Sequence, residues 1–553
     1  MHLRTYSLAA AMAVLGVSLF VGCGSDSSNT SVQTGTFVDS PVKGLYYVSG
    51  STNGTTDDNG TFKYESGKTV KFYLGQNGAL LGETNGSTLV TPLDLSDDGI
   101  DGTKTSNILR VLQSLDSDGD ASNGIDINIT KAAKVKSFNF SDDVNVTAGL
   151  TAAGATIKTA DEAREHFRDT LSTLSAATHV ALIGDLPYGT SPTDVSQYNA
   201  MPTFIASINQ DKQVSAILHA GDIHSGKQYC TEEYDRNIST LFGTYNKPLI
   251  YTPGDNEWTD CHKKKEGGGA YNSTTTQIDY VLDANNNPID YASGNPVDNL
   301  NLIRALFFAN PGTTLGTAMS VHSQAVDYDH AYPNDANFSE NVWWEKDGVL
   351  YVAVNIPGGS NDDTDPWYGA PSMSTQQQNE VAQRSAADLR WLDVAFAKAK
   401  ASGDYAMVIL TQADMWDTDG ASAEHISNYK RYIDKIAAGS TMFGKPVLLV
   451  NGDSHVFRSD NPLKPNSPCY IEPTPGVDAV ACSADNAIPV LGTNPADPYE
   501  TQPNGYNVPN FHRIVVHGST NPMEWIKLSI YSKANAAHGK DAFGPFSWKR
   551  INQ

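Results

Sequence analysis

Short runs of β-branched and aromatic residues predict β-structure in the first part of the chain, from residue 35 to about residue 130. Segments rich in Gly, Asn and Asp separate these runs, as turns do between short strands. The runs are Thr36–Val38, Leu45–Val48, Thr61–Tyr64 and Val70–Leu74. Strands at this spacing predict a small β-sandwich, within a β-rich module that we place at residues 35–150.

The pattern changes in the next part of the chain. Residues 161–176 place apolar side chains at helical spacing behind an acidic start, which predicts a helical linker over residues 151–177. From residue 178 to residue 553, short apolar strands alternate with polar loops and helical segments. This alternation is typical of a layered α/β domain. The predicted fold class is therefore α/β, with layered sheets flanked by helices and preceded by a small all-β domain.

Four strands of the predicted α/β domain run into the same dipeptide, Gly-Asp. The four carboxylates are Asp185, Asp222, Asp255 and Asp453, and His455 follows the last of them. Polar groups at the ends of such strands meet at one edge of the sheet, where sites form in open α/β folds. Carboxylates gathered there would repel one another unless cations lay between them. The sequence therefore predicts a metal site.

This series of motifs resembles the calcineurin-like metallophosphoesterase superfamily over about residues 178–530. On that resemblance, the five motifs are Gly184-Asp185, Gly221-Asp222, Gly254–Glu257, the strand before Gln412, and Gly452–His455. The resemblance implies the metallophosphoesterase β-sandwich and hydrolysis of a phosphate-ester substrate by a water that two divalent ions activate. It assigns one ion to Asp185, Asp222 and His455, and the other to Asp222, Asp255 or Asn256, Gln412 and Asp453.

Several positions depart from the pattern of that family. Asp255 stands where an Asn ligand is usual, and Gln412 and Asp453 stand where His ligands are usual. The resemblance implies two divalent ions, which could be Mn, Mg, Ca, Fe or Zn. Oxygen ligands favour Mg, Mn or Ca over Zn. These losses also leave open an alternative function, that of a non-catalytic surface binding or adhesion lipoprotein with a degenerate phosphoesterase fold.

A further departure concerns the proton donor. Asn256 occupies the position of the His that protonates the leaving group in the family. His224 and His262 each lie close to a motif and are the candidate replacement acids. The alternative is that both are ordinary polar loop residues.

The N-terminus predicts export. Residues 1–23 combine Arg4, an apolar stretch and Cys23, which resembles a bacterial lipoprotein signal peptide whose Cys becomes the lipidated N-terminus. Residues 24–34 are expected to form a flexible tether. The alternative is an ordinary signal peptide with an incidental Cys. The expected location is the bacterial cell envelope, with a lipid anchor in the outer membrane or at the cell surface.

The residues after the tether add a second resemblance. Gly35–Val42, with Thr56–Phe62, resembles a β-module found near the N-terminus of bacterial surface lipoproteins. The remaining four cysteines form two pairs close in sequence, which predicts the disulfides Cys230–Cys261 and Cys469–Cys482 in an oxidising compartment. A zinc site is the alternative, but the chain has no CxxC motif or Cys/His cluster.

Asp116, Asp118 and Asp120 alternate with small residues, as ligands do in the first half of an EF-hand loop. They are candidate ligands for a separate Ca²⁺. The twelfth position is Ile127 rather than Glu, so the closing ligand is missing. A solvated acidic turn is the equal alternative.

The formal charge of −24, from 38 basic and 62 acidic residues, argues against nucleic-acid binding through bulk charge. Contact with a membrane is expected through the N-terminal lipid only, because no later apolar run is long enough to span a bilayer. Against this acidic background, Lys263–Lys265 form a short basic run beside Cys261. The run is either a solvated loop or a patch that steers an anionic substrate.

Overall fold

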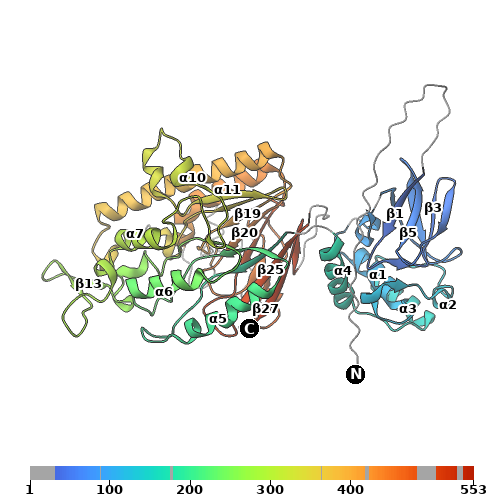
Figure 1. Ribbon diagram of the computed structural model, residues 1–553, viewed down its shortest axis with the longest axis horizontal. Helices are drawn as coiled ribbons and strands as arrows, with labels where there is room; N and C mark the ends of the chain where they lie inside the picture. The colour runs from blue at the N-terminus through green and yellow to red at the C-terminus, as the bar shows by residue number, and fades with distance from the viewer. Residues whose placement is uncertain are drawn as a thin grey trace.

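The computed structural model describes residues 32–87, 89–96, 98–174, 178–362, 364–417, 423–482, 506–531 and 540–553. Cys23, the predicted signal peptide and most of the predicted tether lie outside these residues. A small N-terminal module and a larger α/β domain lie side by side, with α4 between them (Figure 1). The predicted fold class is therefore confirmed. No helix among the described residues is both long and apolar enough to cross a membrane.

Two small sheets form the β-sandwich of the N-terminal module. One has the strand order β5-β1-β8 and the other β4-β3-β6-β7. Phe62 packs between them, with its ring centroid 5.0 Å from that of Phe72. The strands are β1 (Val32–Phe37), β3 (Tyr46–Ser49), β4 (Thr52–Thr55), β5 (Thr61–Glu65), β6 (Thr69–Tyr73), β7 (Leu80–Asn85) and β8 (Leu89–Val90). The predicted strands are present, and β1 also includes residues 32–34, which the sequence assigned to the tether.

The second half of the module is helical rather than β-rich. It contains α1 (Thr103–Ser114), α2 (Ile129–Ala132) and α3 (Asp143–Ala153), with only the short pair β2 (Val42–Lys43) and β9 (Ile125–Asp126) as strands. The buried side chains Val111 and Leu112 of α1 join the same core as the sandwich. The description of residues 35–150 as β-rich thus holds up to about residue 90, and helices cover the sandwich after that.

Helix α4 (Ala160–Leu174) occupies most of the predicted linker. Ala163 and Phe167 are fully buried and pack with Leu109 of α1 and Ala542 of the C-terminal sheet. An ion pair of 2.6 Å between Arg168 and Asp101 adds to this contact. Residues 160–174 therefore form a packed wedge between the two parts of the molecule.

The α/β domain is built on two large sheets. The first has the order β15-β12-β11-β10-β25-β27-β26, and the second β16-β17-β18-β19-β20-β24-β21-β22-β23. In the first, β10, β11 and β12 are parallel neighbours. In the second, β18, β19, β20 and β24 are parallel. Runs of buried apolar residues fit strands that are covered on both faces.

The strands of the first sheet are β10 (Thr178–Ile183), β11 (Val214–His219), β12 (Pro248–Tyr251), β15 (Leu315–Gly316), β25 (Glu524–Ile530), β26 (Ala542–Phe543) and β27 (Phe546–Asn552). Those of the second are β16 (His322–Ser323), β17 (Val342–Lys346), β18 (Val349–Ala353), β19 (Ala406–Leu410), β20 (Val447–Asn451), β21 (Arg458–Asp460), β22 (Tyr470–Ile471), β23 (Val480–Ala481) and β24 (Phe511–Val515). A separate hairpin pairs β13 (Gly269–Asn272) with β14 (Gln277–Tyr280).

The two sheets pack face to face, and helices cover their outer faces (Figure 1). One core cluster joins Leu182 and Leu218 of the first sheet to Leu448 and Val450 of the second. The first sheet is covered by α5 (Ser196–Gln210), α6 (Glu232–Phe242) and α7 (Pro296–Phe307). The second is covered by α10 (Thr375–Ser402) and α11 (Ala423–Phe443), and α8 (Gln324–Asp327) and α9 (Gly358–Asn361) are short connecting turns.

Candidate metal centre

Loops from both sheets bring Asp185, Asp222 and His455 together. Asp185 follows β10, Asp222 follows the parallel neighbour β11, and His455 follows β20 of the other sheet. One ligand atom from each residue lies within 4.8 Å of the other two, and no other group of three such side chains is found among the described residues. These are the three residues that the sequence assigned to one ion.

Several residues of this centre have left-handed backbone conformations. The φ angles are 51° for Asp185, 58° for Asp222, 76° for Asp453 and 63° for His455. A residue other than Gly in this region costs roughly 1–2 kcal/mol. Such strain tends to be found at functional sites. The fold therefore holds four side chains of the candidate centre at the expense of local backbone energy.

The Gly residues that precede the aspartates make room for neighbouring carboxylates. A Cβ on Gly254 would lie 1.9 Å from Asp222 Oδ1, and a Cβ on Gly452 would lie 2.3 Å from Asp185 Oδ2. Both distances are far below contact, so only Gly fits. The repeated Gly-Asp pairs thus follow from how closely the loops approach one another.

Burial and mutual repulsion act strongly on the two central carboxylates. Asp185 and Asp222 are buried. Burial, reinforced by the charges of Asp255 and Glu257, raises the pKa of both carboxyl groups well above the usual range. Asp185 Oδ2 has no hydrogen-bond donor among the described residues. A divalent cation would offset this cost, so the residues present fit a metal ion.

Tyr188 connects the centre through its hydroxyl group. The hydroxyl donates to Asp222 Oδ2 at 2.5 Å and accepts from Asn256 Nδ2 at 2.8 Å. His455 Nε2 lies 3.2 Å from the same oxygen. The sequence analysis did not include Tyr188, although it lies three residues after Asp185, in Gly-Asp-Leu-Pro-Tyr.

The third motif supports Asp222 from a second direction. Asn256 Nδ2 donates to Asp222 Oδ2 at 2.8 Å. Glu257 Oε1 accepts from the backbone N–H groups of Asp222 at 3.2 Å and Gly254 at 2.5 Å, and from the hydroxyl of Tyr251 at 2.5 Å. Burial raises the pKa of Glu257 to about 7. Glu257 thus fixes the turns that present two of the candidate ligands.

Three of the residues assigned to the second ion, Asp255, Asp453 and Gln412, lie around Gly358. A Cβ there would be 2.6 Å from Asp453 Oδ1 and 2.9 Å from Asp255 Oδ2. Gln412 donates to Asp255 Oδ1 at 3.0 Å, and its oxygen accepts from the Gly358 backbone N–H. Burial and the charge of Asp260 raise the pKa of Asp255 to about 6. Both the nitrogen and the oxygen of the Gln412 amide are therefore engaged in hydrogen bonds, to Asp255 and to the Gly358 backbone.

The structure places the two candidate replacement acids elsewhere. His224 is fully buried against the ring of Tyr234, and burial lowers its pKa to about 4. His262 accepts from the backbone N–H of Tyr368 at 2.9 Å, and burial lowers its pKa to about 4 as well. Within the described parts of the chain, neither ring is hydrogen-bonded to Asp185, Asp222 or His455. The contacts of both rings thus go to other residues, and their role as acids remains a prediction.

Both predicted disulfides are present. Cys230–Cys261 and Cys469–Cys482 are bonded, with Cα atoms 5.7 and 5.4 Å apart. The first touches the centre, because the backbone oxygen of Asn256 lies 3.3 Å from Cys230 Sγ. It ties the loop after Asp222 to the loop of the third motif.

The acidic loop of the N-terminal module differs from this centre. Asp118 accepts from the backbone N–H of Asp120, and Asp120 from that of Ser122, at 2.9 and 3.1 Å. Both side chains are exposed, whereas Asp116 is buried and its Oδ2 has no donor among the described residues. The candidate Ca²⁺ site at these residues remains a prediction.

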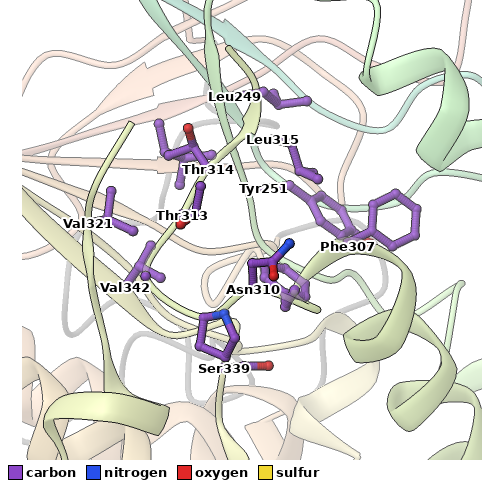
Figure 2. Close-up of a pocket in the computed structure, with 14 residues that line it drawn as sticks. Leu249, Tyr251, Phe307, Asn310, Thr313, Thr314, Leu315, Val321, Ser339 and Val342 are labelled. Carbon is purple, nitrogen blue, oxygen red and sulfur yellow. The ribbon is translucent and has the colours of Figure 1, made fainter. Parts of the chain in front are cut away.

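A small cavity of about 20 Å³ lies beside β12 and β15 (Figure 2). Leu249, Tyr251, Phe307 and Leu315 line it with mostly apolar atoms. It has room for about one water molecule, and none of the candidate metal ligands borders it. The chemistry therefore lies at the loop edge of the sheets rather than in this cavity.

Comparison with protein families identifies the domain that carries this centre. Residues 178–391 match the family model "Calcineurin-like phosphoesterase". Residues 178–391 therefore carry a calcineurin-like phosphoesterase domain, and the match supports the metallophosphoesterase superfamily. The match includes the first three motifs, and the fourth and fifth motifs, with Gln412 and His455, lie beyond it.

Among solved structures, the chain is similar to a purple acid phosphatase from yellow lupin (Lupinus luteus) seeds. The identity is 10% and the TM-score 0.27, and the match covers 68% of this chain and 54% of that one. The chain thus spans about half the length of that structure. No curated protein matches this chain.

Proposed function

We propose that this protein is an exported phosphoesterase that hydrolyses a phosphate ester with the help of two divalent metal ions. One observation carries the proposal. Asp185, Asp222 and His455 converge within 4.8 Å in a domain of the calcineurin-like phosphoesterase family. Convergence of these side chains from two sheets is costly unless a cation binds there.

The residues divide into two sets of candidate ligands. Asp185, Asp222 and His455 would hold one ion, and Asp222, Asp255 and Asp453 would hold the other, with Asn256 and Gln412 orienting Asp222 and Asp255 through their amide groups. Divalent ions in these places would supply positive charge to the ester and lower the pKa of a water molecule. The hard oxygen donors favour Mn, Mg or Ca over Zn.

Other side chains of the chain hold Asp222 in place. Tyr188 and Asn256 each donate a hydrogen bond to its Oδ2, and Glu257 accepts from its backbone N–H. Two side chains therefore orient the carboxylate that would serve both ions, and Glu257 fixes the backbone that carries it. Such outer contacts commonly set metal affinity.

We also propose that the chain is lipid-anchored through Cys23 in the bacterial cell envelope, at the outer membrane or cell surface. The two disulfides support an oxidising compartment. The membrane would then be contacted through the lipid only.

Metal analysis combined with an ester assay tests the function. The purified chain should carry close to two divalent ions and hydrolyse a chromogenic phosphate monoester or diester with added Mn²⁺ or Mg²⁺. Treatment with a chelator should abolish the activity, and Mn²⁺ should restore it. A chain that is empty of metal and inactive toward both esters would favour the alternative of a non-catalytic binding lipoprotein.

A further inference from the structure

Three consecutive lysines near the candidate metal centre have different surroundings. Lys263 pairs with Asp260 at 2.6 Å and Asp365 at 3.4 Å. Lys264 is exposed on the surface. The side chain of Lys265 is 63% exposed, and its Nζ lies 3.2 Å from Glu266 Oε1. The ammonium group of Lys265 therefore lies beside a carboxylate, while most of its side chain is exposed to solvent.

The tip of Lys265 lies against the centre at Gly226. A Cβ on Gly226 would lie 3.0 Å from Asn256 Oδ1, 3.2 Å from Lys265 Nζ and 3.3 Å from Glu266 Oε1. The ammonium group and the Asn256 amide oxygen thus face the same Gly. Because Asn256 also donates to Asp222, a single side chain separates the ammonium from the carboxylate proposed to serve both ions.

The position of this ammonium matters because its surroundings are acidic. The chain has a formal charge of −24, and carboxylates make up most of the candidate centre. An anionic ester approaching it would meet repulsion from residues that no ion neutralises. Glu266 is fully buried and keeps the ammonium at the rim. An ammonium has three donors, so the pairing with Glu266 leaves others for a ligand.

We propose that Lys265 binds an anionic group of the substrate outside the metal centre. The preferred substrate is then a phosphate ester that carries a second anionic group, a carboxylate or another phosphate, close to the ester that is cleaved. This inference rests on the proposed phosphoesterase function and deepens it by naming a class of substrate. Lys265 is the specificity residue, and Lys263 and Lys264 are not.

A binding experiment tests the inference without turnover. Calorimetry on the Mn²⁺-loaded full chain would compare phosphonoacetate, which carries a second anionic group, with methylphosphonate, which does not. We expect phosphonoacetate to bind more tightly, and Lys265→Ala to remove about fivefold of this preference, roughly the value of one exposed ion pair. Lys265→Arg should keep most of the preference. Lys264→Ala is the matched control and should leave it unchanged.

A kinetic arm separates this inference from the function on which it rests. The KM of phenyl phosphate and of 3-carboxyphenyl phosphate would be measured for the same variants. Lys265→Ala should raise the KM of the carboxylated ester alone. If both esters are hydrolysed but Lys265→Ala behaves like Lys264→Ala, the inference is overturned and the function stands. If neither ester is hydrolysed but the phosphonate contrast depends on Lys265, the function fails and the anion site stands. Failure of the wild-type chain to prefer phosphonoacetate overturns the inference directly.

Discussion

Two groups of aspartates in this molecule both lie next to Gly or other small residues in the sequence, but their surroundings in the structure differ. Asp118 and Asp120 of the N-terminal loop are exposed and accept hydrogen bonds from backbone N–H groups of their own loop. Asp185 and Asp222 of the α/β domain are buried, and Asp185 Oδ2 has no donor among the described residues. Acidic spacing alone therefore does not define a metal centre. Loss of water around carboxylates that lack donors is the stronger indication.

The pKa directions express the same contrast. Hydrogen bonds from Asn123 and from the Asp120 backbone lower the pKa of Asp118, and those from Ser122 lower the pKa of Asp120. Burial raises the pKa of Asp185 and Asp222. The loop thus stabilises the charges of Asp118 and Asp120 through its own hydrogen bonds, whereas burial disfavours the charges of Asp185 and Asp222, as it does at Asp116, whose pKa burial raises.

The largest expected effect comes from Asp222→Asn. A carboxylate shared by two ions contributes charge to both, so its loss should remove most of the bound Mn²⁺ and lower kcat/KM by about 10³-fold or more, roughly 4 kcal/mol. Metal analysis and steady-state kinetics would measure this. Circular dichroism would show whether the variant folds.

Asp118→Asn is the matched control from the other group. It removes one carboxylate with the same isosteric change and should leave the Mn²⁺ content and the activity unaltered. If the two variants lose metal equally, the contrast between the groups is wrong. Full Mn²⁺ content and activity in Asp222→Asn would refute its assignment as the shared ligand.

The next effect concerns the leaving group. Asn256 cannot titrate, and among the described residues neither the His224 ring nor the His262 ring is hydrogen-bonded to Asp185, Asp222 or His455. General acid catalysis is worth about 10²–10⁴-fold for basic leaving groups, so aryl phosphates should be hydrolysed about 10²-fold faster than alkyl phosphates. A series of esters would show a steep dependence of log kcat/KM on leaving-group pKa. A shallow dependence that His224→Ala or His262→Ala abolishes would identify a replacement acid instead.

Tyr188→Phe should have a smaller effect on the same centre. The change removes the hydroxyl that joins Asp222, Asn256 and His455 and retains the ring. Loss of such an outer contact commonly costs 10–100-fold in metal affinity, which titration with Mn²⁺ would measure. Tyr234→Phe is the control, since that hydroxyl donates to the Pro187 backbone oxygen at 3.4 Å and is hydrogen-bonded to none of the candidate ligands among the described residues. Equal Mn²⁺ affinities in the two variants would show that the Tyr188 hydroxyl does not contribute to metal binding.

The contrast also explains what the sequence could predict. Strands that end in Gly-Asp are local patterns, so Asp185, Asp222 and the loops that meet could be inferred from spacing. Tyr188 could not be ranked above other tyrosines, because its importance arises from contacts with residues far along the chain. The same holds for α4, whose amphipathic pattern predicts a helix but not its packing against Ala542. Gln412 orients Asp255 and the Gly358 backbone through hydrogen bonds. The sequence of the strand that precedes Gln412 does not predict these partners.

The smallest expected effect is a difference in how stability depends on pH. The pKa of Asp255 is about 6 in the folded chain, above the usual unfolded value of about 3.9. Asp255 therefore contributes stability that is present below about pH 4 and is lost as the pH rises through about 6. The buried His224 and His262, whose pKa values are lowered to about 4, act with the opposite sign, because the unfolded chain binds more protons there between about pH 4 and 6.5. The contribution of Asp255 is therefore measured by comparing variants in the presence of a chelator. From pH 8 to pH 5, the difference in Tm between the wild type and Asp255→Asn should shift by about 1 °C in favour of the wild type. Asp118→Asn should show no such shift, because the lowered pKa of Asp118 acts only below about pH 4. An equal difference in Tm at pH 5 and pH 8 would mean that the Asp255 carboxyl group is already ionised at pH 5 in the folded chain.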